Sequence, residues 1–513
     1  MKLDFIKNTK RNAIAYFISQ CVATVFPFLR KTLFLWILGS EYLGLNGLFF
    51  SNLGMLMLSE MGFGKAIVSY MYKPVAEDNN ELLCAYLGFF RKVYHLVGGF
   101  IFISGLCVMP FLKYFIHGHI PSDVNLYVLY LLFLLKTAVG YFFFAYRGAV
   151  FAAHHRGDIT TYIGILTGGT EFLLSCLVLW LTHNYYYYVY VLIGCALLNN
   201  VCVMIASKKY YPEMVPRGKL PSQDVKRILS DVKAIFMHKI GAVLSSSFDT
   251  LAISSFLGLT PVASFGNYGH IKDAVGSMAG GLCYSMLGGF GNKIYTESKE
   301  ENFRLLMKAH RLLICIILWG GSMLLALYQP FMIIWTRKDP MMVRHFLTPL
   351  LMVIWFYELQ SRETLRMFKT AASLWQPDKW KAVVAGIVNL ALNLTFINVF
   401  PDKYKLDGVI LATLLTDVFI QMPWESYAVF TAFFGRKEAV HYWRQQAIYL
   451  LLAVVFSGAT WGGAYAIPLD GLHGFFVKGV VAMAISVGLL LAVFRKDALA
   501  VLKKVILRKK GEA

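Results

Sequence analysis

Long apolar runs follow one another along the whole chain, separated by short polar and charged stretches. A run of about 20 mostly apolar residues is long enough to cross a bilayer as an α-helix. Such runs lie at residues 12–38, 43–71, 86–112, 126–151, 160–181, 186–206, 234–257, 265–290, 312–328, 346–372, 382–400, 408–430, 448–467 and 475–494. The pattern therefore predicts an all-α polytopic membrane protein with about fourteen transmembrane helices.

The composition excludes other classes of protein. The 513 residues are 58% hydrophobic and 15% charged, whereas soluble domains have about 45–50% apolar and about 25% charged residues. Aromatic residues make up 15% of the chain, which argues against a disordered protein. None of the eight cysteines has CxxC spacing, and all lie in or directly beside apolar runs. We therefore expect buried free thiols rather than disulfides or metal ligands.

The basic charge balance predicts how the helices are oriented. The chain has 49 Lys and Arg against 29 Asp and Glu, a net charge of +20. With the N-terminus inside, about 30 of the basic residues fall in cytoplasmic segments, about 6 in outer loops and about 13 in the spans. Cytoplasmic loops of membrane proteins collect Lys and Arg in this way. We therefore expect both termini to be cytoplasmic and no nucleic-acid partner.

The longest cytoplasmic loop divides the first twelve spans into six and six. It contains Pro212, Pro216, Gly218 and Pro221, which is typical of a linker. We expect an N-terminal lobe at 1–206, a cytoplasmic linker at 207–233, a C-terminal lobe at 234–430, two further spans at 431–494 and a basic cytoplasmic tail at 495–513. A weak internal match aligns Leu38–Gly39 with Leu257–Gly258. Internal repeats of this kind are how many secondary transporters are built.

Motifs for catalysis, ATP hydrolysis and metal binding are missing from the sequence. There is no GxxxxGK[ST] phosphate-binding loop and no HExxH. The pair His154–His155 lies between apolar runs and has no third ligand nearby in the sequence, so we interpret it as a solvated turn. We therefore expect no enzyme, no catalytic residue, no cofactor and no metal site, and no ATP-driven motor in this chain.

Charged residues inside the spans are the candidate functional groups. A charge at the bilayer centre costs at least about 2.5–3.5 kcal/mol, so it usually faces a wet cavity or a partner. The deepest are Arg30, Lys136, Glu171, Asp249 and Asp417. For these we favour a cavity lining over internal pairing. Residues nearer the span ends can reach the membrane surface with their charged groups; they include Glu60, Lys65, Arg147, Arg362 and Lys478.

Spacing along the helices adds detail. Glu358 and Arg362 are four residues apart, which favours a local ion pair. In span seven, Asp249 shares a face with His238 and lies near Ser245 and Ser246. In span five, Thr160, Gly164, Thr167 and Glu171 form one stripe, for which close helix packing is the alternative explanation. Cations dominate the first half, so we expect a water-filled cavity that attracts an anion such as pyrophosphate or an acidic sugar.

Several strings resemble the polysaccharide-transporter branch of the MOP superfamily, the Wzx-type flippases of O-antigen, capsule and exopolysaccharide units. They are RN at 11–12, FLR at 28–30, LG at 38–39, YLGL at 42–45, SEMGFGKAI at 59–67, FD at 248–249, LG at 257–258, GNY at 266–268, GN at 291–292, AASLW at 371–375, DK at 378–379, Asn389, Asn393 and DG at 407–408. Each string is short, but their order and spacing cover about residues 8–445.

The resemblance implies two six-helix, MATE-like lobes around a central V-shaped cavity, followed by two C-terminal helices. It implies a flippase in the bacterial cytoplasmic membrane that moves undecaprenyl-pyrophosphate-linked oligosaccharide by alternating access, for capsule or lipopolysaccharide synthesis. Partners would be membrane lipids, a polysaccharide polymerase and a chain-length regulator. The expected substrate-binding residues are Arg30, Lys31, Lys136, Lys239 and Arg147. The expected coupling or gating residues are Glu171, Asp249, Asp417 and Asp273, with H⁺ or Na⁺ as the coupling ion.

Four alternative functions differ from this one in features that the sequence can show. A cation-coupled multidrug antiporter of the related branch usually has twelve spans and a less basic cavity. A lipid II flippase would differ only in the detail of its cavity. A membrane-embedded polymerase would need a large outer loop, and a glycosyltransferase a cytoplasmic nucleotide-sugar domain. The longest outer loop, around Trp335–Arg344, is too short for the polymerase, and no segment is long enough for the transferase domain.

Overall fold

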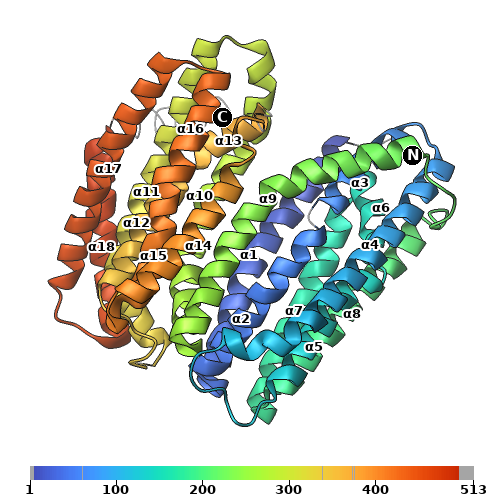
Figure 1. The fold of residues 1–513 in the computed structure, drawn as a ribbon. Helices are drawn as coiled ribbons and strands as arrows, with labels where there is room; N and C mark the ends of the chain where they lie inside the picture. Colours follow the sequence, from blue (N-terminus) through green and yellow to red (C-terminus); the bar gives the residue numbers. More distant parts are fainter. Residues whose placement is uncertain (1–4, 61, 338, 373, 375, 496–513) are drawn as a thin grey trace, which may run out of the picture. The chain divides into compact units, whose positions relative to one another are not determined.

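The computed structural model describes residues 5–60, 62–337, 339–372, 374 and 376–495. Within these ranges, the side chains of residues 5–17, 59, 65, 234–246, 278, 282–289, 291–292, 295 and 376 lie outside the description. All regular structure in the described ranges is helical (Figure 1). The predicted tail at 495–513 lies outside the described residues except for Arg495.

Long helices account for nearly all of the described chain. They are α1 (Phe5–Leu38), α2 (Ser40–Leu56), α3 (Phe63–Ala76), α4 (Asn80–Val108), α5 (Leu126–Phe142), α6 (Gly148–Ala153), α7 (Gly157–Thr182), α8 (Tyr185–Tyr210), α9 (Ser222–Leu257), α10 (Leu259–Thr296), α11 (Lys299–Trp335), α12 (Leu347–Ser361), α13 (Glu363–Ala371), α14 (Lys381–Val399), α15 (Lys405–Thr416), α16 (Met422–Ala432), α17 (Arg436–Tyr465) and α18 (Gly471–Val493). Short 3-10 turns flank several of them, and one π-helical turn (Asp417–Gln421) joins α15 to α16.

The helices confirm a multi-pass membrane protein. In the described part of the chain, nine helical stretches are long and apolar enough to cross a membrane, and the pair of α5 and α6, bent by 41°, makes a tenth. The other predicted spans correspond to the broken pairs α2–α3 and α12–α13 and to α9 and α10. The count of fourteen stays a prediction with which this helix order is compatible.

Contacts divide the chain into two compact units. Unit 1 is Met1–Ala263 with Ala382–Gly386, and unit 2 is Ser264–Lys381 with Ile387–Ala513. In unit 1, α7 packs against α1 and α8, α5 packs against α4 and α8, and α2 packs against α9. In unit 2, the largely buried α11 packs against α12, α17 and α18, and α12 packs against α15. The predicted lobes stay a prediction, and in the predicted linker only 211–221 is irregular, because α9 begins at Ser222.

Asparagine side chains cap the N-termini of several of these helices. Oδ1 of Asn125 accepts hydrogen bonds from the backbone N–H groups of Tyr127 and Val128, at 3.1 and 3.2 Å. The Asn184 side chain accepts one from the N–H of Tyr186 at 2.8 Å. The first N–H groups of a helix have no partner within the helix, so such caps stabilise its start. They fix where α5 and α8 leave the loops before them.

Two glycines break the chain at matching places. Gly39 separates α1 from α2 with φ 105 and ψ 178, and Gly258 separates α9 from α10 with φ 94 and ψ −175. Only glycine adopts this backbone region readily. The aligned strings Leu38–Gly39 and Leu257–Gly258 therefore share a backbone conformation, which supports the internal repeat.

The cysteines agree with the sequence prediction only in part. The seven whose side chains are described are all free thiols. Cys84 and Cys195 are buried, but Cys21 and Cys107 are exposed on their helices, so the expected burial is wrong for these two. An exposed face on a membrane-spanning helix can contact lipid, where an apolar thiol is as well accommodated as in a core.

Candidate functional site

In unit 1, an ion pair joins two of the deepest predicted charges. Nη1 of Arg30 on α1 donates a hydrogen bond to Oε1 of Glu171 on α7. The two helices pack along each other, which brings the groups together although they are far apart in sequence. Their side chains are 23% and 24% exposed, so the pair is within reach of solvent or a ligand. Arg30 and Glu171 thus form an internal pair, whereas a cavity lining was favoured from the sequence; the cavity stays a prediction.

Lys136 on α5 adds a second positive charge to this pair. It interacts electrostatically with both Arg30 and Glu171. Its Nζ lies 5.0 Å from the ring centroid of Phe50, within cation–π range. We call Arg30, Lys136 and Glu171 the Arg30 group. It contains two cations and one carboxylate, so its net charge is positive.

Aromatic residues pack α1 against α7 and α8 around the Arg30 group. The ring of Phe34, one turn beyond Arg30 on α1, makes edge contacts with Tyr185 and Tyr188 of α8, at centroid distances of 5.1 and 5.0 Å. Phe26 stacks on Phe172 of α7 at 4.7 Å. Such pairs contribute about 0.5–1.5 kcal/mol each beyond the area they bury. They fix α1 against α7 and α8 on both sides of Arg30.

The other predicted substrate-binding cations lie elsewhere or are less defined. Lys31 is half-buried on α1, next to Arg30. Arg147 is buried, and its Nη1 donates a hydrogen bond to the carbonyl of Met214 at 2.7 Å, in the loop before α9. The described contacts of Arg147 therefore fix a loop and do not join the Arg30 group. Lys239 lies on α9, and its side chain is outside the described residues.

Asp249, the predicted coupling residue of span seven, is buried. Its side chain belongs to α9 and is 2% exposed. Two residues earlier, the hydroxyl of Ser247 donates to the carbonyl of Ser51 on α2 at 3.1 Å, which anchors this part of α9 in unit 1. His238, Ser245 and Ser246, predicted on the same face, have side chains outside the described residues.

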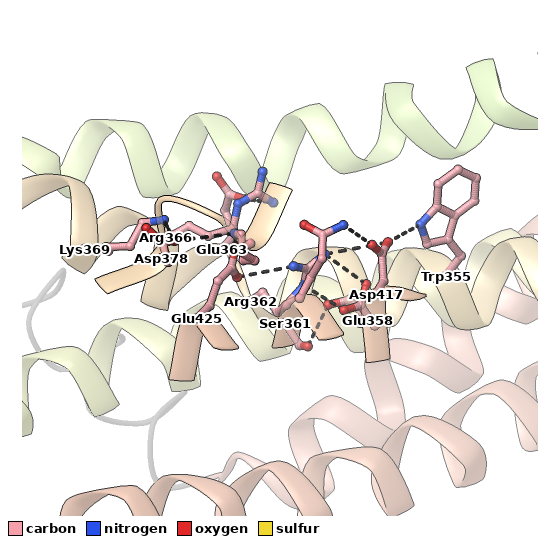
Figure 2. Close-up of polar contacts among 12 residues, drawn as sticks. Trp355, Glu358, Ser361, Arg362, Glu363, Arg366, Lys369, Asp378, Asp417 and Glu425 are labelled. Atoms are coloured by element: carbon pink, nitrogen blue, oxygen red, sulfur yellow. Dashed lines mark hydrogen bonds and ion pairs between the residues drawn. The ribbon is translucent and has the colours of Figure 1, made fainter. Parts of the chain in front are cut away.

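In unit 2, Arg362 is the centre of a buried set of ion pairs (Figure 2). Only 2% of its surface is exposed. Its guanidinium lies 2.7 Å from Glu358, 3.3 Å from Glu425 and 3.7 Å from Asp417. The local pair of Glu358 with Arg362 is thereby confirmed. The Arg362 guanidinium was expected to reach the membrane surface, but it is buried. It faces inward and contacts three carboxylates.

The set continues through two lysines. Nζ of Lys381 at the start of α14 pairs with Glu425 and lies 3.6 Å from Asp378. Nζ of Lys369 on α13 pairs with Asp378. We call these seven residues the Arg362 network: Glu358, Arg362, Lys369, Asp378, Lys381, Asp417 and Glu425. All of them are buried.

Asp417, a predicted coupling residue, opens the π-helical turn between α15 and α16. Its carboxylate accepts hydrogen bonds from Trp355 Nε1 at 2.9 Å and from the Gln421 side-chain amide. Single π-helical turns within α-helices are frequent at functional sites. Asp273, by contrast, is exposed and pairs with its neighbour Lys272 at 2.8 Å. Lys272 in turn lies 3.9 Å from the ring of Trp355, so Asp273 joins the network only indirectly.

Sequence reasoning missed Glu425, Lys369, Lys381 and Asp378 as partners. Glu425 stands within the apolar run 408–430, and this intramembrane carboxylate was the available signal. The lysines lie near expected span ends, where cations are common. The spacing of residues along the sequence does not show that α13, α14 and α16 bring charged side chains to the Arg362 network. That arrangement depends on how the helices pack against one another.

The predicted turn at His154–His155 directly follows α6. His154 is half-buried beside the ring of Tyr211, and burial lowers its pKa below the ordinary value. His155 stacks on Tyr72 at 4.9 Å. Across the described side chains, no group of three or more His, Cys, Asp and Glu residues is placed to hold a metal ion.

Comparisons with known proteins show a family and a fold for the chain. A family model described as "Polysaccharide biosynthesis protein" matches residues 9–280, which is more than half of the chain. No curated protein sequence gives a significant match. A solved structure described as "Lipid II flippase MurJ, inward closed conformation" aligns with a TM-score of 0.68 at 13% identity, over 94% of this chain and 99% of that one.

A second solved structure is described as an inward-facing multidrug resistance MATE family transporter of the MOP superfamily. It aligns with a TM-score of 0.60 at 13% identity, over 79% of this chain and 94% of that one. A third, a MATE structure in the bent conformation, has a TM-score of 0.53 at 14% identity, over 86% of this chain and 97% of that one. At such identities the likeness concerns the fold alone, which this chain shares with these structures.

Proposed function

Because the chain belongs to the polysaccharide biosynthesis protein family, we propose that it is a flippase for lipid-linked oligosaccharide in the bacterial cytoplasmic membrane. The proposed substrate is an undecaprenyl-pyrophosphate-linked repeat unit of O-antigen, capsule or exopolysaccharide. The observation that carries this proposal is the positive charge of the Arg30 group, held within the helices of unit 1. A buried positive group favours an anionic part of a substrate.

The chemistry of the Arg30 group suits pyrophosphate. A guanidinium can form two parallel hydrogen bonds with phosphate oxygens, and these charge-assisted bonds are among the strongest in proteins. Arg30 keeps an open side, and Lys136 supplies a second positive charge beside it. Glu171 holds the guanidinium in place, and a phosphate oxygen would take its position as the substrate binds. Of the five cations predicted to bind substrate, Arg30 and Lys136 are the two on which this proposal rests.

The sequence has no ATP-binding motif, so net transport in this proposal draws on an ion gradient, on the membrane potential or on consumption of the product outside. The transport cycle is alternating access, in which the chain moves its substrate without making or breaking a covalent bond. Glu171, Asp249, Asp417 and Asp273 are the proposed coupling residues, and H⁺ or Na⁺ is the proposed ion. A carboxylate released from its cation in a dry site can take up a proton or Na⁺. The proposal has both termini in the cytoplasm. The proposed partners are a polymerase and a chain-length regulator.

The test is flipping of undecaprenyl-pyrophosphate oligosaccharide in proteoliposomes. Arg30→Ala should abolish flipping with unchanged insertion and protein level. Arg30→Lys should retain part of it, because the charge survives and the paired donors are lost. Arg304→Ala is the matched control: Arg304 is exposed and pairs with Glu301 only, so flipping should stay at the wild-type rate.

Two results would overturn the proposal. Full flipping by Arg30→Ala would reduce the Arg30–Glu171 pair to a packing contact. Transport of lipid II or of a cationic drug, without transport of the undecaprenyl-pyrophosphate oligosaccharide, would assign the chain to one of the alternative functions. Both results are measurable in the same kind of vesicle: the first changes the protein variant, and the second changes the substrate.

A further inference from the structure

We propose that the Arg362 network binds one proton at neutral pH and that Glu358 carries it. The proposal concerns a binding site in unit 2 and depends on no assumption about what the chain transports. It follows from the number of charges in the network, from their burial and from the hydrogen bonds that each carboxylate receives (Figure 2).

The charges of the network do not balance if every group is ionised. Its carboxylates are Glu358, Asp378, Asp417 and Glu425, and its cations are Arg362, Lys369 and Lys381. Each of the seven residues is between 2% and 8% exposed. A net charge without solvent is so costly that a buried group neutralises instead. One bound cation restores the balance, and a proton needs no extra space.

The described neighbours of the network do not supply the missing charge. Arg366 on α13 interacts electrostatically with Glu425, but it is itself paired with Glu363 at 3.0 Å. Lys272 on α10 is paired with Asp273 at 2.8 Å. Each pair is neutral as a whole. The charge excess therefore stays within the network.

Two further titratable side chains face it from α11 and α17. His310 on α11 bonds through Nδ1 to Thr364 at 2.8 Å, and among the described side chains its Nε2 has no hydrogen-bond partner, which is the arrangement of a neutral ring. Tyr442 on α17 is fully buried, and its hydroxyl accepts a hydrogen bond from Gln446. Neither residue adds a positive charge.

Hydrogen bonds single out Glu358 as the carrier. Asp417 accepts from Trp355 and Gln421. Glu425 is bonded to Lys381 and Arg362. Donors such as these stabilise the charged form of a carboxylate.

Glu358, by contrast, has Arg362 alone, which it shares with Asp417 and Glu425. Its Oε1 makes an ionic contact but has no hydrogen-bond partner within the described residues. Asp378 also has a carboxylate oxygen without a hydrogen bond, but two lysines lie against it. A proton therefore displaces the fewest interactions at Glu358.

Infrared spectroscopy of the purified full-length chain tests the proposal. A protonated carboxyl has a C=O stretching band that a carboxylate lacks, and the band shifts in D₂O. Compared with wild type at neutral pH, Glu358→Gln should lose the intensity of one carboxyl. Lys381→Met removes a cation and should gain the intensity of one. Asp402→Asn is the control, because Asp402 is exposed and its removal should leave the band unchanged.

Two additional variants separate a chemical effect from a folding defect. Glu358→Asp keeps an acidic group, so the band should persist at a shifted frequency. Asp417→Asn balances the network by another route and should lose the intensity of one carboxyl. An unchanged band in a folded Glu358→Gln protein would overturn the assignment to Glu358. A band of wild-type intensity in both Asp417→Asn and Lys381→Met, or thermal stability that depends on Na⁺ instead, would overturn the bound proton.

Discussion

Removal of the Arg362 guanidinium should destabilise unit 2 strongly. The charged group contacts three buried carboxylates, at 2.7, 3.3 and 3.7 Å. Arg362→Met keeps much of the side-chain volume but leaves these carboxylates facing one another. Breaking a buried ion pair by removing one partner costs about 3–5 kcal/mol. We expect a loss of this size in the free energy of unfolding of Arg362→Met.

The assay is unfolding of the detergent-solubilised chain, followed by tryptophan fluorescence. Arg304→Met provides the matched control, because Arg304 forms an exposed pair with Glu301 at 2.6 Å, with side chains 64% and 51% exposed. Exposed pairs contribute about 0–1 kcal/mol. The loss in Arg362→Met should shrink as the pH is lowered, since protonation removes the repulsion between the carboxylates. A second substitution, Asp417→Asn, should recover part of the lost stability.

A loss in Arg362→Met no larger than that in Arg304→Met would refute this reasoning. It would mean that water reaches the network and screens its charges. A large loss that is independent of pH would point to lost packing of the long Arg362 side chain rather than to unpaired charge. The double variant distinguishes these cases, because Asp417→Asn relieves charge repulsion but restores no packing.

Three other outcomes are expected. Asp249→Asn should leave substrate binding intact and remove the pH or Na⁺ dependence of transport in proteoliposomes; unchanged ion dependence would exclude a coupling role. Gly39→Ala and Gly258→Ala should each lose about 1–3 kcal/mol of unfolding free energy through backbone strain. The loss should be larger for Gly258→Ala, whose Cβ would lie 2.8 Å from the His117 carbonyl oxygen, whereas nothing lies within 4 Å at Gly39. A cysteine at Lys219 should be labelled only from the cytoplasmic side.

The all-helical, multi-pass class of the fold could be predicted from the sequence. Apolar runs mark the spans because every backbone polar group in a bilayer must be satisfied within a helix. Local pairings were predictable as well: Glu358 and Arg362 are one helical turn apart and are in contact. The start of α9 was not predictable, because the segment from Ser222 to Lys233 is polar and follows a proline-rich loop. A helix that continues beyond the membrane loses the apolar signal on which the prediction rests.

The sequence could identify residues of the candidate site but not which of them contact one another. Arg30 and Glu171 stood out as deep charges, but their contact depends on how α1 lies along α7. Arg147 was expected to bind substrate, and its described hydrogen bond is to the Met214 carbonyl, a backbone acceptor that no side-chain pattern reveals. Tertiary contacts of this kind come from packing between helices and leave no periodic mark on the sequence.

The Arg30 group and the Arg362 network have net charges of opposite sign, so each suits a different kind of ligand. The Arg30 group has an excess of one positive charge and is partly open, which suits an exchangeable anion. The Arg362 network has an excess of carboxylate and is closed, which suits a small cation such as a proton. If both proposals hold, substitutions at Arg30 should change the apparent affinity for the oligosaccharide lipid at every pH. Substitutions at Glu358 should change the pH profile and leave that affinity at its wild-type value, because the charge they alter belongs to the Arg362 network and not to the Arg30 group.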